Sequence, residues 1–370
     1  MIVFLVLSVI HVLAFAWIWF HWVRIPEISI EQGGFDQRFS VIIPVRNEEG
    51  NIGNLLFQID TQNYPKDQFE VIVVDDHSED GTAEVVKRLI PEVGYQLKYF
   101  EAVENKGKKA AITLGVAKAS FEYIVTTDGD CRVSPDWLGS YASGYQKTGC
   151  SMLTGSVKMT GSGWLAAFQQ VEFGCLIGMG AGALHSGNPS MCNGANLSYK
   201  KVAFENVQGY QGNDQIPSGD DEFLLQKVYG QFPGKISFLR SPENIVFTPS
   251  KLTIGELINQ RVRWSGKWKY HKSWFVKWTA IYVFFDFLFL LTALLLAGSG
   301  FFDWRWVGLI AGIRWLIDLG YILSVGRFFS ISAMKSTGVS LGLQIIYPVF
   351  VSFLGIASIF GKYSWKGRRY

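Results

Sequence analysis

The hydrophobic positions of this chain form four long apolar stretches around one region of mixed patterning. The first stretch is Met1–Trp22, and three more lie late in the chain, at about Phe275–Ala297, Trp306–Val325 and Val339–Phe360. A run of about 20 apolar residues spans the core of a bilayer as a helix. We therefore expect one N-terminal transmembrane helix and about three C-terminal ones.

A cleaved signal peptide is the alternative interpretation of Met1–Trp22. No basic segment opens the stretch, its apolar run is too long, and no A-x-A-like cleavage site follows it. The pattern therefore favours a retained helix.

Strand and helix patterns alternate in the region of mixed patterning. They predict strands at Ser40–Val45, Phe69–Asp76, Gln96–Val103 and Tyr123–Thr127, and helices at Glu49–Thr61, Thr82–Ile90 and Lys108–Ala119. Continuous apolar runs such as Val71–Val74 suit strands that are covered on both faces. The order predicts a doubly wound α/β domain with a mostly parallel sheet and with ligands at the carboxyl ends of its strands. No GxGxxG follows the first strand, which disfavours a dinucleotide-binding fold.

Composition agrees with a membrane protein. Charged residues make up 18% of the 370 residues, against about 25% in a soluble domain. The net charge of +3 is too weak to indicate nucleic acid as a partner. The four cysteines form no CxxC pair, so we expect reduced thiols in a cytoplasmic domain and no zinc site: Cys131, Cys150, Cys175 and Cys192.

The basic residues beside the apolar stretches predict the orientation. Arg24 follows the first stretch, and a basic cluster from Arg261 to Lys277 precedes or opens the second. Both place the globular domain in the cytoplasm, and we expect a multi-pass protein of a bacterial cytoplasmic (inner) membrane. Three later spans would then put the C-terminal tail outside, although it carries Lys362, Lys366, Arg368 and Arg369. Either one late segment is re-entrant or interfacial, or the C-terminal tail is an exception to the rule that basic flanks stay in the cytoplasm.

Two further segments leave alternatives open. Arg314 and Asp318 are four residues apart, on one helical face of the third apolar stretch. They form either a structural ion pair or a group that acts on substrate, and the ion pair is favoured. The apolar, glycine-rich segment Gly161–His185 is either an interfacial helix or a buried core helix.

Acidic residues stand at two predicted strand ends. Asp128 and Asp130 flank Gly129, so that both can face one hard cation, Mg²⁺ or Mn²⁺. Such a cation would neutralise a diphosphate leaving group. Acidic turns are common, and the position after a strand is what favours a metal site. Asp75 and Asp76 follow another strand and could accept hydrogen bonds from a nucleobase or a ribose, or cap the next helix.

Two later motifs also suit sugar transfer. Asp220 and Asp221 open a helix, where the helix dipole alone would favour them, and a carboxylate there could serve as a general base. Gln260, Arg263 and Trp264 share one helical face just before the second apolar stretch. Arginine can hold a diphosphate and tryptophan offers a stacking surface, but an interfacial basic-aromatic helix has the same pattern.

In this order, these motifs resemble the membrane-bound inverting glycosyltransferases of family 2, which have the GT-A fold and include cellulose synthase, hyaluronan synthase and ceramide glucosyltransferase. The first strand, Val41–Val45, and the following turn are also similar. The resemblance covers about residues 38–270. It implies a Rossmann-like GT-A sheet domain joined to α-helical transmembrane segments, with these boundaries: a transmembrane helix at 1–23, the GT-A domain at 38–250, an interfacial helix with the QxxRW motif at 251–272, and transmembrane helices at 273–362.

The resemblance also implies roles for residues. Asp76 would contact uracil or ribose with Asp75 beside it, Asp130 would hold the metal, and Asp128 would contact ribose or metal. Asp221 would be the general base, and Asp220 or Glu222 could share that role. Arg263 and Trp264, with Gln260 beside them, would bind the diphosphate. Asn193, within Cys192–Asn196, would belong to the acceptor site. A turn into a strand is the alternative for that last stretch.

The implied function is transfer of a sugar, with inversion, from a nucleotide-sugar donor, expected to be a UDP-sugar, to a membrane lipid or lipid-linked acceptor. Few predicted spans favour a single transfer over a secreted polymer. A processive polysaccharide synthase is the alternative within the enzymes. A non-catalytic membrane protein with a degenerate nucleotide-binding domain is the alternative outside them, and the retained carboxylates count against it.

Overall fold

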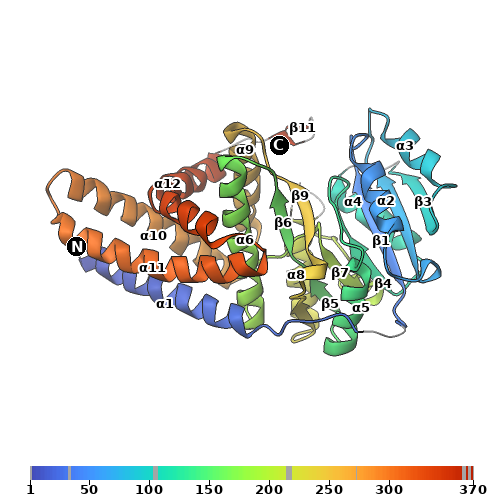
Figure 1. Ribbon diagram of the computed structural model, residues 1–370, viewed down its shortest axis with the longest axis horizontal. Helices are drawn as coiled ribbons and strands as arrows, with labels where there is room; N and C mark the ends of the chain where they lie inside the picture. The colour runs from blue at the N-terminus through green and yellow to red at the C-terminus, as the bar shows by residue number, and fades with distance from the viewer. Residues whose placement is uncertain are drawn as a thin grey trace. The chain divides into compact units, whose positions relative to one another are not determined.

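The computed structural model describes residues 2–31, 35–102, 107–213, 219–271, 273–360, 364–365 and 368–369. The chain forms two compact units, whose elements are labelled in Figure 1. The helical unit comprises Met1–Arg24, Gly161–Asn188 and Ser250–Tyr370, and the sheet unit comprises Ile25–Thr160 and Pro189–Pro249. Met1, Val103, Lys362 and Lys366 of the expected segments lie outside the described residues.

The sheet unit is built on a seven-stranded, mostly parallel sheet. Its strands are β1 (Phe39–Val45), β2 (Phe69–Asp75), β3 (Gln96–Glu101), β4 (Tyr123–Thr126), β5 (Met152–Thr154), β7 (Leu197–Lys200) and β8 (Ile236–Phe238). Their order is β3-β2-β1-β4-β7-β5-β8, and only β7 runs antiparallel to its neighbours. A small second sheet pairs β6 (Val157–Thr160) with β9 (Val246–Pro249). The predicted α/β class is confirmed.

Helices follow the strands of this unit in the predicted alternation. They are α2 (Ile52–Asp60), η1 (Lys66–Gln68), α3 (Thr82–Leu89), α4 (Lys108–Lys118), α5 (Trp137–Thr148), α7 (Lys201–Asn206), α8 (Asp220–Gln231) and η2 (Pro242–Asn244). On one face of the sheet, Ile42 and Ile72 pack with Ile112 of α4 in a shared core. The backbone of α4 crosses β1 so closely that a Cβ on Gly115 would lie 2.5 Å from Ile42 Cγ2.

The strand order brings the predicted site together. β1 lies between β2 and β4 and is parallel to both, so the carboxyl ends of the three strands share one edge of the sheet. The chain order reverses at β1, and ligands of such sheets bind in the crevice at that point. The predicted strands and helices of this region are confirmed, with ends that differ by a few residues.

The helical unit contains the four predicted apolar stretches. Its elements are α1 (Ile2–Arg24), α6 (Trp164–His185), α9 (Ile254–Ser265), η3 (Gly266–Tyr270), α10 (Trp274–Gly298), α11 (Trp304–Phe328), α12 (Ala333–Phe360), β10 (Ser364–Trp365) and β11 (Arg368–Arg369). Within the described residues, α1, α10, α11 and α12 are long and apolar enough to cross a membrane. Figure 1 shows α1, α10 and α11 running side by side.

Helix α6 departs from the predicted domain boundaries. It lies inside residues 38–250, the range expected for the GT-A domain, but it packs with the helical unit. Its glycines allow this packing. A Cβ on Gly178 would lie 2.6 Å from Tyr321 Oη of α11, and one on Gly182 would lie 2.9 Å from the carbonyl oxygen of Ile18 on α1.

A buried network of charged side chains joins the four apolar helices. Arg314 of α11 makes two ion-pair contacts with Asp286 of α10, at 2.9 and 2.7 Å. His11 of α1 contacts Asp286 and Asp318 with its two ring nitrogens, each at 2.9 Å. Gln344 of α12 donates to Asp318 at 2.9 Å. The expected Arg314–Asp318 pair is therefore wrong in its partner, because a neighbouring helix offers Arg314 a better-placed carboxylate.

Loss of Arg314 should destabilise the protein strongly. Arg314→Ala would leave Asp286, which is 2% exposed, without its guanidinium partner. Removing one partner of a buried ion pair costs about 3–5 kcal/mol. Thermal unfolding in detergent micelles measures the loss. Arg305→Ala, at an exposed position on the same helix, is the control and should leave the unfolding midpoint unchanged. Equal midpoints for the two variants would contradict this account of the network.

Candidate active site

The turn that follows β2 is built around the side chain of Asp75. Its Oδ1 accepts a hydrogen bond of 2.7 Å from the backbone N–H of Ser78, and its Oδ2 accepts one of 3.0 Å from the hydroxyl of Tyr99 on β3. Burial and the charge of Asp75 raise the pKa of Tyr99, so the hydroxyl stays protonated and donates. Both oxygens of Asp75 thus fix the shape of this strand end.

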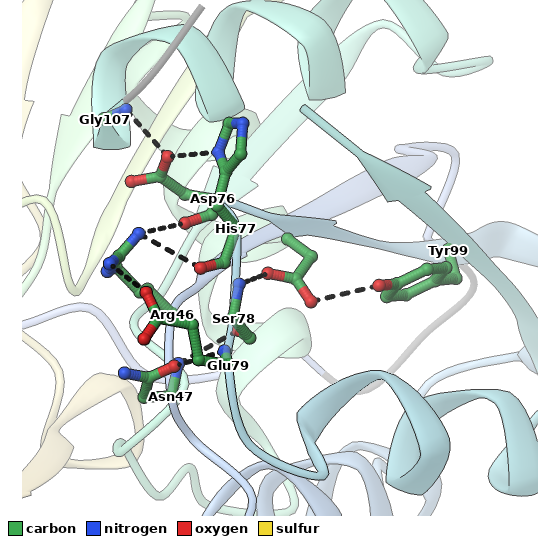
Figure 2. A network of polar contacts seen from close by, with 9 residues as sticks. Arg46, Asn47, Asp76, His77, Ser78, Glu79, Tyr99 and Gly107 are labelled. Atoms are coloured by element: carbon green, nitrogen blue, oxygen red, sulfur yellow. Dashed lines mark hydrogen bonds and ion pairs between the residues drawn. The ribbon is translucent and has the colours of Figure 1, made fainter. Parts of the chain in front are cut away.

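The next residue, Asp76, is buried and faces the start of α4. Its Oδ1 accepts a hydrogen bond of 2.9 Å from the N–H of Gly107 and lies 3.2 Å from Nδ1 of His77 (Figure 2). Arg46 Nη1 donates to the carbonyl oxygens of Asp76 and His77, at 3.0 and 3.1 Å. His77 has a φ of 61°, in the left-handed region that non-glycine residues rarely adopt. Arg46 therefore stabilises an unusual turn that aims the Asp76 carboxylate.

Asp80, rather than this pair, accepts a backbone N–H at the start of helix α3, whose N-cap residue is Gly81. Its Oδ1 accepts from the N–H of Thr82 at 3.1 Å, and its Oδ2 accepts from the N–H of Glu49 at 3.2 Å. Slight burial opposes the effect, but these hydrogen bonds lower the pKa of Asp80. The alternative in which Asp75 and Asp76 serve as helix caps loses its basis.

Asp128 and Asp130 lie directly after β4, as predicted, and both are half-buried. Gly129 between them faces the end of β1. A Cβ at this position would lie 3.0 Å from Val45 Cγ1 and 3.1 Å from Glu48 Cγ. Glycine therefore lets the acidic turn lie against the end of β1.

The ammonium group of Lys108, the first residue of α4, links two acidic motifs. Nζ lies 2.7 Å from Asp128 Oδ1 and 3.4 Å from Asp220 Oδ2. Burial by itself would lower the pKa of Lys108, but the charges of Asp128 and Asp220 outweigh burial and raise it. Sequence reasoning missed this residue, because a helical lysine is typical of an exposed surface. The available signal was its position, since a lysine in the first turn is unfavourable against the helix dipole.

Asp221 joins the same cluster through Gly194. The N–H of Gly194 donates to Asp221 Oδ2 at 3.0 Å, and the N–H of Glu222 donates to Oδ1 at 2.8 Å. A Cβ on Gly194 would lie 3.0 Å from Asp220 Oδ2 and 3.2 Å from Lys108 Nζ. Asp220 is buried, whereas Asp221 is half-buried. The structure thus brings both helix-start carboxylates to the motif after β4.

Asn193 shapes the turn that precedes β7. Its Oδ1 accepts from the N–H of Ala195, and its carbonyl oxygen accepts from the N–H of Asn196, both at 3.0 Å. The turn into a strand, one of the two interpretations of Cys192–Asn196, is confirmed. The same turn also contacts Asp221, through Gly194.

The residues at this edge fit a hard divalent cation that binds together with a ligand. No group of three or more His, Cys, Asp and Glu side chains that could hold a metal ion occurs among the described residues. Mg²⁺, however, is usually bound by one or two carboxylates, with substrate phosphates and waters completing its shell. Asp128 and Asp130 supply that donor set. Burial and the charges of both aspartates raise the pKa of the neighbouring Cys131 thiol well above its usual value, so it stays protonated.

Gln260, Arg263 and Trp264 lie on α9, in the helical unit, and the acidic residues lie in the sheet unit. Arg261 Nη1 donates to Gln260 Oε1 at 2.7 Å, and its guanidinium carbon lies 4.3 Å from the centre of the Trp264 ring. Arg261 therefore holds two of the three predicted residues. In the sequence, Arg261 stands out only as part of the basic cluster beside the second apolar stretch.

The fold and the acidic strand ends define a GT-A-like glycosyltransferase domain. A family model, Glycosyl transferase family 2, matches residues 40–205. A second, Glycosyl transferase family group 2, matches residues 123–328, more than half of the chain. The chain belongs to glycosyl transferase family 2, which confirms the resemblance seen in the sequence.

Individual relatives are more distant. A poly-beta-1,6-N-acetyl-D-glucosamine synthase of Staphylococcus epidermidis is 26% identical over 61% of this chain and 53% of its own. A dodecaprenyl-phosphate galacturonate synthase of Rhizobium johnstonii is 30% identical over 31% of this chain and 35% of its own. The chain thus spans between about a third and about half the length of the curated relatives it matches.

One solved structure is similar over nearly the whole chain. It is a mannosyltransferase from Pyrobaculum calidifontis in complex with GDP-Man and Mn²⁺, with a TM-score of 0.58, 18% identity and coverage of 96% of both chains. At this identity the likeness establishes the fold.

Gly129→Ala should destabilise the sheet unit, because its Cβ would press on Val45 and Glu48. Overpacking of this kind costs about 1–3 kcal/mol. Gly230→Ala in α8 is a matched control, since a Cβ there meets nothing within 4 Å. Thermal unfolding of both variants measures the difference. If Gly129→Ala unfolds at the wild-type temperature, the close approach of the acidic turn to β1 is wrong.

Proposed function

We propose that this protein is an inverting glycosyltransferase that transfers a sugar from a nucleotide-sugar, expected to be a UDP-sugar, to a lipid or lipid-linked acceptor. The observation that carries the proposal is the cluster in which Asp128, Asp220 and Asp221 gather around Lys108 and Gly194. Such a cluster offers both of the groups that the reaction needs. These are carboxylates for a cation-bound diphosphate and a carboxylate for proton transfer.

Asp221 is the proposed general base. Inversion requires a carboxylate that accepts the proton of the attacking hydroxyl as that oxygen bonds to the anomeric carbon. Asp220 is buried, and its Oδ2 lies 3.4 Å from the Lys108 ammonium, so this carboxylate is engaged in an ion pair. Asp221 is more accessible, and two backbone N–H groups orient it. Asp220 then supports the site by holding Lys108.

The nucleotide-sugar donor is proposed to bind at the carboxyl ends of β2 and β4. Asp76 is proposed to recognise the nucleobase or ribose, with Asp75 shaping the turn, and Asn193 is proposed to face the acceptor. Asp128 and Asp130 would hold Mg²⁺ or Mn²⁺, which neutralises the charge that develops on the leaving diphosphate. The Mn²⁺ and GDP-Man of the similar mannosyltransferase support a cation and leave the nucleotide open. Gln260, Arg263 and Trp264 are proposed to bind the diphosphate.

The acceptor is proposed to be a component of the membrane that the apolar helices would cross. The protein would be a multi-pass protein of a bacterial inner membrane, with its catalytic domain in the cytoplasm. Four apolar helices and a relative named for a dodecaprenyl-phosphate product support this proposal. The relative that makes poly-beta-1,6-N-acetyl-D-glucosamine matches a larger share of the chain. A processive polysaccharide synthase is therefore the second candidate.

Release of nucleoside diphosphate by the detergent-purified protein tests these proposals. A panel of nucleotide-sugars would be supplied with Mn²⁺, with and without total lipid extract. Release that needs one donor and added lipid supports lipid glycosylation. Release without lipid, accompanied by a growing polymer, supports the synthase. No release under any condition would contradict both.

Asp221→Asn should bind donor as the wild type does but lose turnover. A general base contributes about 10²–10⁴-fold to the rate, and kcat should fall by that factor. Donor affinity would be measured by calorimetry and kcat by diphosphate release. Asp67→Asn, at an exposed position in η1, is the control and should change neither. Donor affinity that falls as far as kcat would argue against Asp221 as the base.

Removal of divalent cations should abolish turnover, and added Mn²⁺ or Mg²⁺ should restore it. Asp130→Asn should raise the cation concentration needed for half-maximal activity, because it removes one of the two carboxylates proposed to hold the cation. A cation titration of both proteins measures the shift. Full activity in excess chelator would eliminate the metal assignment.

A further inference from the structure

A buried ion pair fastens α9 to α6 within the helical unit. Arg261 donates from Nε to Glu172 Oε1 at 3.1 Å and from Nη2 to Oε2 at 2.6 Å. The two side chains are 4% and 3% exposed. Two parallel hydrogen bonds fix the plane of the guanidinium as well as its position.

The remaining atoms of this guanidinium hold two residues of the QxxRW motif. Nη1 can only donate, so Gln260 must turn its amide oxygen toward Arg261, and this sets the direction of its NH₂ group. The guanidinium carbon lies over the Trp264 ring, and the centre of that ring is 5.4 Å from the centre of the Phe173 ring on α6. One buried arginine thus fixes the orientation of a polar and an aromatic motif residue.

The start of α9 is fixed to the same helix. Gln169 of α6 exchanges two hydrogen bonds with the backbone of Lys251, at 2.9 and 2.8 Å. Thr253 then caps α9 together with Glu256 in a reciprocal capping box. Further along α9, Arg261 is held by Glu172 of α6. Helix α9 therefore has two attachments to α6, and these set its rotation about its own axis.

We propose that Glu172 and Arg261 are positioning residues for sugar transfer. They orient Gln260 and Trp264 and set the register of the helix that carries Arg263. The inference rests on the proposed role of the motif in binding the diphosphate. A buried ion pair is weak evidence for stability, because apolar residues of similar volume often serve as well. A displacement of about 1 Å in a positioned group, in contrast, can cost about 100-fold in rate.

Two variants separate positioning from folding. Glu172→Gln removes the charge that orients Arg261. Arg261→Lys keeps a cation beside Glu172 but loses the hydrogen bond to Gln260 and the guanidinium over Trp264. Both should lower kcat by about 10- to 100-fold, with a smaller loss of donor affinity, because Arg263 itself is retained. Arg261→Lys should also keep the wild-type unfolding temperature within a few degrees, so its loss of rate would not reflect misfolding.

Gln170→Ala is the matched control, because Gln170 lies on the same helix and contacts Lys335 instead of α9. It should leave kcat unchanged. Arg263→Ala tests the proposed function of the motif. If Arg263→Ala loses activity while Arg261→Lys keeps it, the positioning inference is overturned and the proposed function stands. Full activity of Arg263→Ala would overturn the role of the motif and the inference with it.

Discussion

Carboxylates that are held close together in a partly buried site need a positive charge among them, and the candidate site of the sheet unit is organised by this requirement. Asp128, Asp220 and Asp221 come from two different segments and converge where Gly194 leaves room for them. Lys108 supplies the positive charge in the protein itself. A diphosphate with its cation would bring further charge of both signs.

Buried charges among the apolar helices are also paired, but by a different arrangement. There, Arg314, Asp286, His11 and Asp318 satisfy one another across three helices, and Gln344 adds the fourth. Charged groups at such positions are costly unless they pair, so the network specifies which helices must be neighbours. The Glu172–Arg261 pair has a comparable geometry but a different connection, since Arg261 also contacts motif residues. Burial and pairing alone therefore do not reveal what a charged group does; its remaining contacts do.

The sequence predicted well what depends on local patterning. Strands β1, β2 and β4 are apolar runs, and acidic residues stand at the ends of β2 and β4. The positions of the strands and the edge that carries Asp75, Asp76, Asp128 and Asp130 are therefore predictable from the chain itself. Partners distant in sequence were not predictable in this way. Asp286 replaced Asp318 as the partner of Arg314, because spacing along one helix says nothing about a neighbouring helix.

Two other failures have the same origin. Lys108 could not be recognised as the counter-charge of Asp220, more than a hundred residues away, since that pairing depends on how α4 and α8 meet. Helix α6 was assigned to the wrong unit because its glycines indicate a packing surface but do not identify the helix that packs on it.

The site residues themselves show a common arrangement. Asp75, Asp221 and Gln260 each have side-chain oxygens held by donors in their own unit. Because protein contacts made in advance orient these groups, the groups need no reorganisation as charge develops in the transition state. Substitution of such a holding residue should therefore act on the rate more than on the affinity, both in the acidic cluster and at Arg261 of α9.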